Sequence, residues 1–159
     1  MPALVTPDHT DDHPPMLKLL LVFVGGGVGA VLRFLLQHAL NPPTGGVTEH
    51  AAASSSLTAH WPWGTLLANT LGCVAIGALG GLASAKPILD EPTRLVLVVG
   101  LLGGFTTFSA LAGESLSLWS ASPLRALAYL ATTNIAGLGL AAGAYVAVRG
   151  AMAPTLPAP

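Results

Sequence analysis

Four long apolar stretches dominate the pattern of hydrophobic and polar positions along this chain. They cover residues 17–40, 63–85, 93–119 and 124–148, and only a few polar side chains interrupt each one. A helix needs about 20 predominantly apolar residues to cross the hydrocarbon core of a bilayer. The pattern therefore predicts an all-α membrane protein with four transmembrane helices and the lipid bilayer as its main solvent.

The composition supports this class and excludes others. Of 159 residues, 52% are hydrophobic and 8% are charged, whereas soluble domains carry about a quarter charged residues. The formal net charge is −1 and no basic patch is present, so nucleic acid is not expected as a partner. Cys73 is the single cysteine, which rules out a disulfide framework or a thiolate metal cluster.

The polar segments define one membrane domain, residues 17–148, between two tails. Residues 1–16 are rich in proline and aspartate and lack the basic region of a signal peptide, so we expect a disordered tail. Residues 149–159 form a second tail. The connection at 41–61 contains many small polar residues and no hydrophobic pattern, and we expect it to be mobile.

The most informative segment lies inside the third stretch, where residues 103–109 read Gly-Gly-Phe-Thr-Thr-Phe-Ser. Glycine and threonine weaken a helix, and a broken backbone at membrane depth is tolerated only when it is buried in protein or lines a wet cavity. The third helix is therefore predicted to break near its middle. Carbonyls ending the first half suit a small cation, and N–H groups starting the second half suit an anion.

Glycine pairs at four-residue spacing occur in every apolar stretch. Such pairs let helix backbones approach closely, which matters where lipid removes the hydrophobic drive for association. We therefore expect tight helix packing at four pairs: Gly25 and Gly29, Gly77 and Gly81, Gly100 and Gly104, and Gly139 and Gly143.

Several polar residues inside the stretches each allow two interpretations. Asn69, one turn after Thr65, fits either interhelical bonding or amide donation to an anion. Arg33 fits either a basic side chain that reaches the membrane surface or a cation at a pore mouth. Glu114 should face the bundle interior and find a partner, in a salt bridge or in a functional role.

Aromatic and hydroxyl residues add two further candidates. Phe108 fits either simple packing or an electropositive ring edge that faces an anion. Tyr129 and Thr133 share one helix face, and with Thr132 and Asn134 they indicate a wet face on the fourth helix.

Three segments together resemble the CrcB/Fluc family of fluoride channels. They are Gly29-Ala30-x-x-Arg33, the run Pro-Trp-Gly-Thr-Leu-Leu-Ala-Asn at 62–69, and the segment 103–109 with Glu114. The resemblance covers nearly all of residues 17–148. It implies an antiparallel, dual-topology homodimer with two pores in the cell inner (plasma) membrane. It also implies passive fluoride export from the cytoplasm, which relieves fluoride toxicity.

The same resemblance implies roles for individual residues. A structural, non-transported sodium ion would bind the backbone carbonyls of Gly103 and Thr106. Asn69 would line the pore, the edge of Phe108 would meet fluoride, and Arg33 would be a vestibule cation. The remaining pore candidates are Thr65, Thr107, Ser109, Tyr129, Thr133 and Asn134, with Glu114 as the membrane acid. This chain has Leu111 where the family usually has a second pore phenylalanine.

Other functions explain less of the sequence. Residues 25–30 fit the glycine pattern of dinucleotide binding, but that motif needs a βαβ unit and the apolar run continues through it. A proton-coupled multidrug exporter usually needs a carboxylate in its first helix, and here Glu114 is the membrane acid. A non-transporting assembly subunit leaves the break without a role. An enzyme is not expected, because no nucleophile–base pair or metal triad is found.

Overall fold

The computed structural model describes residues 14–41, 61–85 and 89–152, and helices are the regular secondary structure of these ranges. Four of its helical spans are long and apolar enough to cross a membrane, as the hydropathy pattern predicts. The elements are α1 (Pro15–Leu40), α2 (Trp63–Ala85), α3 (Glu91–Arg94), η2 (Leu95–Leu102), α4 (Gly103–Phe105), α5 (Phe108–Ala121) and α6 (Pro123–Ala151).

The outer helices are longer than the sequence predicts. Residues 15–16 and 149–151, which we assigned to tails, belong to the ends of α1 and α6. Proline is compatible with the first turn of a helix, and Arg149 lies in the last turn of α6, where a positive charge is favourable. Apart from Pro14 and Met152, the rest of both tails lies outside the described residues, and so does nearly all of the 41–61 connection.

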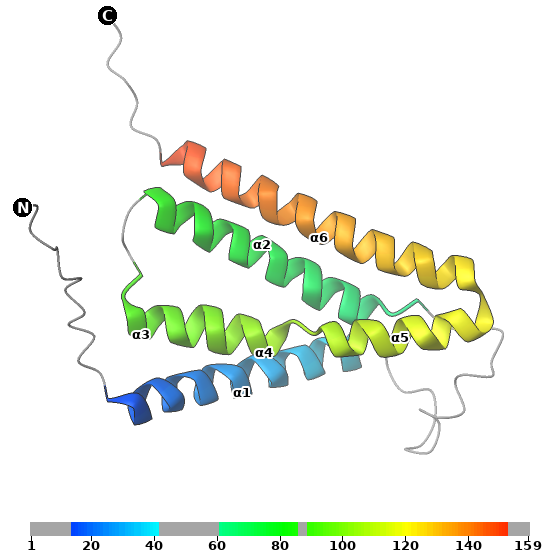
Figure 1. Cartoon of the computed structure of the whole chain (residues 1–159), viewed down its shortest axis with the longest axis horizontal. Helices are drawn as coiled ribbons and strands as arrows, with labels where there is room; N and C mark the ends of the chain where they lie inside the picture. The colour runs from blue at the N-terminus through cyan, green and yellow to red at the C-terminus, as the bar shows by residue number, and fades with distance from the viewer. Residues whose placement is uncertain (1–13, 42–60, 86–88, 153–159) are drawn as a thin grey trace, which may run out of the picture.

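The four spans run antiparallel in chain order, so that α1 begins at the end of the bundle where α6 finishes (Figure 1). α2 packs mainly against α6, while α1 packs along η2 and α4. The third span consists of α3, η2, α4 and α5, and its second half turns toward α6. Two helix pairs are thus joined through the third span, and the break lies between them.

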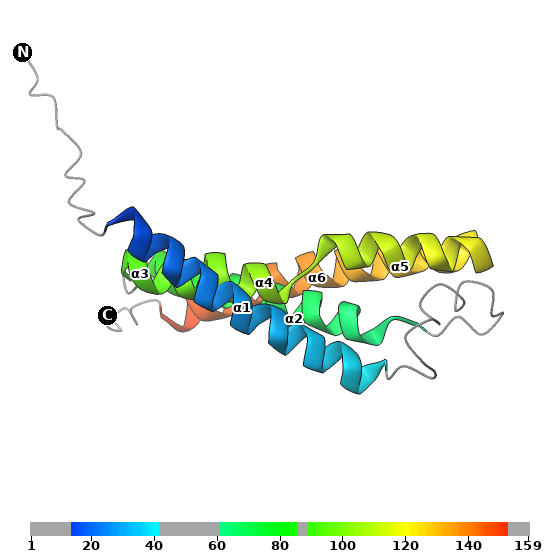
Figure 2. The same cartoon turned by 90° about the horizontal axis from the view of Figure 1, so that it is seen from below.

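The third span is interrupted at Thr106 and Thr107. These two residues are extended, with φ and ψ of −85° and 155° at Thr106 and −152° and 116° at Thr107. Figure 2 shows the extended link between α4 and α5. The predicted break is confirmed, but it falls on the threonines, because Gly103 and Gly104 remain helical in α4.

The first half of this span also contains a wide helical turn that the sequence does not predict. Residues Leu95–Leu102 form a π-helix, and the N–H of Gly103 reaches the carbonyl of Val98. π-Helical turns often occur at functional sites. Here the wide turn leads directly into the break.

Glycines set the distance between the helices. A Cβ at Gly104 would overlap the Gly26 carbonyl, and one at Gly100 would lie 2.9 Å from the Cα of Gly25. Gly77 and Gly81 pack in the same way against the α6 backbone at Ala141 and Tyr145. Three of the four predicted glycine pairs therefore mediate close packing.

The fourth glycine pair does not. A Cβ at Gly139 or Gly143 would meet no atom within 4 Å, so the prediction for this pair is wrong for the single chain. The nearest α6 glycine toward the break, Gly137, takes the packing position instead, where a Cβ would lie 3.1 Å from the sulfur of Cys73.

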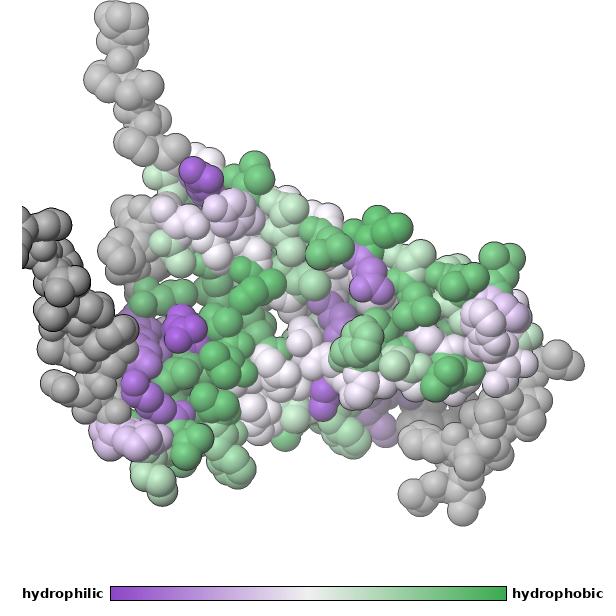
Figure 3. Space-filling view, in the orientation of Figure 1, coloured by the Kyte–Doolittle hydropathy of each residue, from purple (hydrophilic) through white to green (hydrophobic). Residues whose placement is uncertain are grey.

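The molecular surface is mostly apolar. Figure 3 shows a predominantly hydrophobic face with polar residues gathered near its middle and at one end. Large side chains such as Phe23 and Ile135 are 78% and 72% exposed, which is normal when lipid or another chain covers them. The buried apolar cluster is small and lies between α5 and α6, at Leu111, Leu118, Ala126 and Tyr129.

Candidate functional site

Two hydrogen bonds hold the break open. The N–H of Thr107 donates to Oδ1 of Asn69 at 2.8 Å, and the N–H of Ala110 donates to Oγ1 of Thr107 at 3.2 Å. In a continuous helix these N–H groups would bond the carbonyls four residues earlier, at Gly103 and Thr106. Because the break sends these two N–H groups to side chains, the carbonyls of Gly103 and Thr106 lose their usual helical donors. These are the two carbonyls that the family resemblance assigns to sodium.

The chemistry of these two carbonyls fits part of a cation site. Oxygen ligands suit a hard cation, but such cations as calcium and magnesium take six or more of them. Nη1 of Arg33 donates to the Thr106 carbonyl at 3.3 Å, and its positive charge opposes a cation at that oxygen. Gly103 and Thr106 can contribute main-chain oxygens to a metal site but cannot complete one alone.

In the part of the chain that the structure describes, acidic, histidine and cysteine side chains do not supply the missing ligands. Within residues 14–41, 61–85 and 89–152, no group of three His, Cys, Asp or Glu is placed to hold a metal ion. Further oxygens for a cation at the break would have to come from hydroxyl or amide side chains, from water or from a second chain.

Asn69 connects α2 to the break in both directions. Its Nδ2 donates to the Thr107 carbonyl at 3.1 Å while its Oδ1 accepts from the Thr107 N–H. This confirms the interhelical interpretation of Asn69. An amide carries two N–H hydrogens, so one remains beyond this pair to donate to an anion.

A groove of about 440 Å³ lies beside the break. Its described lining is uncharged and includes seven of the predicted site residues: Asn69, Gly103, Thr106, Thr107, Phe108, Thr133 and Asn134. Leu111, at the place of the second phenylalanine, also lines this groove and is only 3% exposed. The structure thus brings polar groups from three spans to one hollow at membrane depth.

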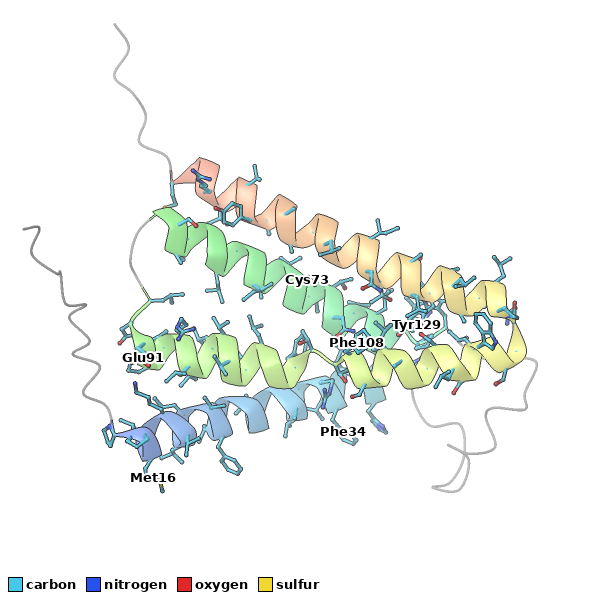
Figure 4. All side chains as sticks on the ribbon, viewed as in Figure 1. Met16, Phe34, Cys73, Glu91, Phe108 and Tyr129 are labelled. Atoms are coloured by element: carbon cyan, nitrogen blue, oxygen red, sulfur yellow. The ribbon has the colours of Figure 1, made fainter. Side chains whose placement is uncertain are left out.

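Phe108 does not pack inside the chain. The side chain is 77% exposed at the first position of α5, and Figure 4 places it beside the break. The alternative interpretation, simple packing, would therefore need lipid or a second chain against the ring. The exposed ring can contact lipid, a second chain or an ion in the groove.

A second group of predicted residues forms a hydrogen-bonded network away from the groove. The hydroxyl of Thr65 donates to Oε1 of Glu114 at 2.6 Å, and the hydroxyl of Tyr129 donates to Oε2 at 2.7 Å. Thr65 and Tyr129 are 1% and 0% exposed. The expected partner of Glu114 is confirmed, but hydroxyl groups take the place of the basic residue that a salt bridge requires.

One member of this network, Gln37, is not among the residues predicted from the sequence. Nε2 of Gln37 donates to Oγ1 of Thr65 at 2.8 Å. A signal was available, because Arg33, Gln37 and Asn41 lie four residues apart on one face of α1. All three bond to neighbouring elements, with Asn41 bonding the Trp61 carbonyl and the Gly64 N–H of the α2 N-terminus.

The remaining candidates on the fourth span separate by burial. Thr133 is buried and donates to the Tyr129 carbonyl of its own helix, while Asn134 is exposed and donates to the Leu130 carbonyl. Tyr129 and Thr133 therefore share the inward face of α6. Ser109 is exposed on α5, and its hydroxyl lies 3.2 Å from that of Thr107.

Comparison with known proteins agrees with the resemblance found in the sequence. The family model described as "CrcB-like protein, Camphor Resistance (CrcB)" matches residues 20–145. A protein of Chloroflexus aurantiacus named fluoride-specific ion channel FluC is 40% identical over 77% of this chain and 88% of its own length.

Two further relatives carry the same kind of name. A FluC protein of Phocaeicola vulgatus is 43% identical over 65% of this chain and 74% of its own length. A FluC 2 protein of Nocardia farcinica is 40% identical over 76% of each chain. Relatives at this identity are named as channels and not as enzymes, as the sequence analysis expected. The matched residues include most of all four apolar spans and the whole break, and this chain therefore belongs to the CrcB-like family of multi-pass membrane proteins.

Proposed function

We propose that this chain is a fluoride-specific ion channel that lets fluoride leave the cytoplasm passively and so relieves fluoride toxicity. The names of its relatives give the ion. The carrying observation in the structure is the uncharged, mostly apolar groove at the break, where the polar side chains of Asn69 and Thr107 lie beside Phe108 at membrane depth.

The chemistry of the groove suits a small, strongly hydrated anion. Fluoride must exchange its water for other donors before it can cross, and those donors must also release it. The spare N–H of Asn69, the hydroxyl of Thr107 and the edge of Phe108 are neutral groups of this kind. A fixed positive charge in the groove would bind the anion more tightly and slow its exit.

A second copy of the chain completes the proposed channel. Phe108 is exposed beside the groove, and Gly103 and Thr106 provide only two oxygens for a structural sodium ion. An antiparallel homodimer in the inner (plasma) membrane would cover the ring and would bring a second pair of carbonyls to the break. The sodium ion would neutralise these main-chain oxygens and stabilise the irregular backbone, without being transported.

The direct test is ion efflux from liposomes that contain the purified protein. A fluoride electrode should record rapid fluoride efflux, while chloride loaded at the same concentration should stay inside. Collapse of the proton gradient should leave the fluoride rate unchanged, because the proposed transport is passive. Efflux that stops without a proton gradient would indicate a coupled exporter, and absence of any fluoride efflux would contradict the proposal.

The assembly needs its own measurement. Cross-linking in native membranes should give a dimer, and reporter fusions at the end of α6 should be found on both sides of the membrane. A reporter on one side alone would contradict the antiparallel arrangement and would leave the fluoride proposal to the efflux measurement.

A further inference from the structure

We propose that Gln37 is a positioning residue for fluoride passage, because its amide fixes the direction of the Thr65 hydroxyl hydrogen. This inference rests on the proposed channel function. It assigns a role to a side chain of α1 that lies outside the groove and reaches the network through one hydrogen bond of 2.8 Å.

The Thr65 hydroxyl takes part in two hydrogen bonds of this network. A hydroxyl has one hydrogen to donate and two lone pairs that accept. The hydrogen of Thr65 goes to Glu114 at 2.6 Å, so the group of Gln37 that faces Thr65 must be its NH₂. The bonds therefore run in one direction, from Gln37 through Thr65 to the carboxylate.

Glu114 needs donors on both sides. An ionised carboxylate only accepts hydrogen bonds. Here Thr65 donates to one oxygen of Glu114, and Tyr129 donates to the other. If the Gln37 amide is removed, nothing on α1 occupies the lone pair of Thr65. The bond to Glu114 is then the one that sets the direction of the Thr65 hydrogen, and the hydroxyl is held less firmly.

The α1–α2 contact holds Gln37 in place. Gly64 lies against Gln37, since a Cβ at Gly64 would lie 2.7 Å from the Gln37 Cα. One turn further, Asn41 accepts from the Gly64 N–H at 2.7 Å. The close contact between α1 and α2 therefore restricts the position of the Gln37 side chain and holds its amide against Thr65.

The network continues toward the groove on the same helix faces. Thr65 lies one turn before Asn69 on α2, and Tyr129 lies one turn before Thr133 on α6. The orientation of the Thr65 and Tyr129 hydroxyls is thereby linked to the neighbouring groove residues Asn69 and Thr133, although the two hydroxyls do not line the groove themselves. Gln37 acts on this donor set through Thr65 and does not itself line the groove.

The test compares two variants of Gln37 with a neighbouring control in the liposome assay. Gln37→Met keeps the length of the side chain but removes the amide, and we expect fluoride efflux to fall roughly two- to tenfold, the range that one hydrogen bond supports. Gln37→Glu draws the Thr65 hydrogen away from Glu114 and should reduce efflux at least as much. His38→Leu removes a polar group from an exposed neighbour on α1 and should leave the rate unchanged.

A double-mutant cycle separates positioning from a general structural effect. In a Thr65→Val background, Gln37→Met should cause no further loss of efflux, because the hydroxyl it orients is gone. Equal losses in both backgrounds, or wild-type efflux in Gln37→Met, would overturn the inference. If the wild-type protein and His38→Leu carry no fluoride at all, the proposed function fails, and the positioning role in fluoride passage fails with it.

Discussion

Asn69 and Thr107 exchange two hydrogen bonds, from the Thr107 N–H to the asparagine Oδ1 and from the asparagine Nδ2 to the Thr107 carbonyl. One side chain thus satisfies both backbone groups of a residue that has left the helix ladder. An unsatisfied backbone group in lipid costs several kcal/mol, so this pair makes the break possible at membrane depth. Asn69 also lines the groove and has one amide hydrogen beyond this pair.

Asn69→Asp should remove both donor functions of this side chain while keeping its acceptor. The carboxylate still accepts from the Thr107 N–H, but it has no hydrogen for the Thr107 carbonyl and adds a negative charge to a neutral groove. We expect fluoride efflux from liposomes to be abolished. Unchanged efflux would remove Asn69 from the ion path.

Asn69→Ala should mainly affect stability. It leaves the N–H and the carbonyl of Thr107 without their partner, at a cost of about 1–3 kcal/mol per buried group. Thermal unfolding in detergent measures this loss. Asn134→Ala is a matched control, because that exposed amide bonds only the Leu130 carbonyl of its own helix.

The glycines of α1 allow a comparison of close packing with open space. In Gly29→Ala the new Cβ would overlap the Leu101 carbonyl, and two backbones cannot move apart cheaply, so we expect destabilisation of about 1–3 kcal/mol or more. In Gly27→Ala the Cβ meets nothing within 4 Å, and the variant should be neutral or more stable by up to about 1 kcal/mol. Equal melting temperatures for both variants would contradict this account.

The spans were predictable because lipid leaves a strong pattern. α2 covers residues 63–85, as predicted, since Trp63 begins the apolar run and the described helix ends at its last residue. The break was also visible, but its exact place was not. Gly103 and Gly104 weaken a helix, yet they stay helical because the partner that opens the backbone, Asn69, bonds Thr107.

The missed features depend on distant partners. Gln37 and Thr65 are 28 residues apart, and no local pattern shows that they meet. The glycine spacing of Gly139 and Gly143 is indistinguishable from that of the packed pairs, because only the arrangement of the helices decides which glycines face a neighbour. The π-helix at 95–102 has no sequence signature at all in this apolar run.

Glu114→Gln should disturb the network without changing its size. The amide keeps one acceptor but turns an NH₂ group toward a hydroxyl that is itself a donor. Either Thr65 or Tyr129 then loses its acceptor, and we expect fluoride efflux to fall by about tenfold or more, in line with the greater strength of hydrogen bonds to charged groups.

The control for this charge change is Glu91→Gln. Glu91 pairs with Lys18 at 2.9 Å at one end of the bundle, outside the network. The pair is partly buried but Gln keeps an acceptor for Lys18, so efflux should stay close to wild type and thermal stability should fall by no more than about 1 kcal/mol. If Glu114→Gln also behaved like wild type, the network would have no role in transport.

The proposed structural cation should depend on main-chain oxygens and not on the Thr106 side chain. When sodium is replaced by a large organic cation during purification and in the assay, the rate of fluoride efflux should fall. The rate should recover when sodium is added back. Thr106→Val removes only the hydroxyl, which donates to the Leu102 carbonyl at 3.0 Å, and keeps the main-chain carbonyl. This variant should therefore keep the sodium dependence of the parent. Equal efflux with and without sodium would show that the carbonyls of Gly103 and Thr106 hold no functional cation.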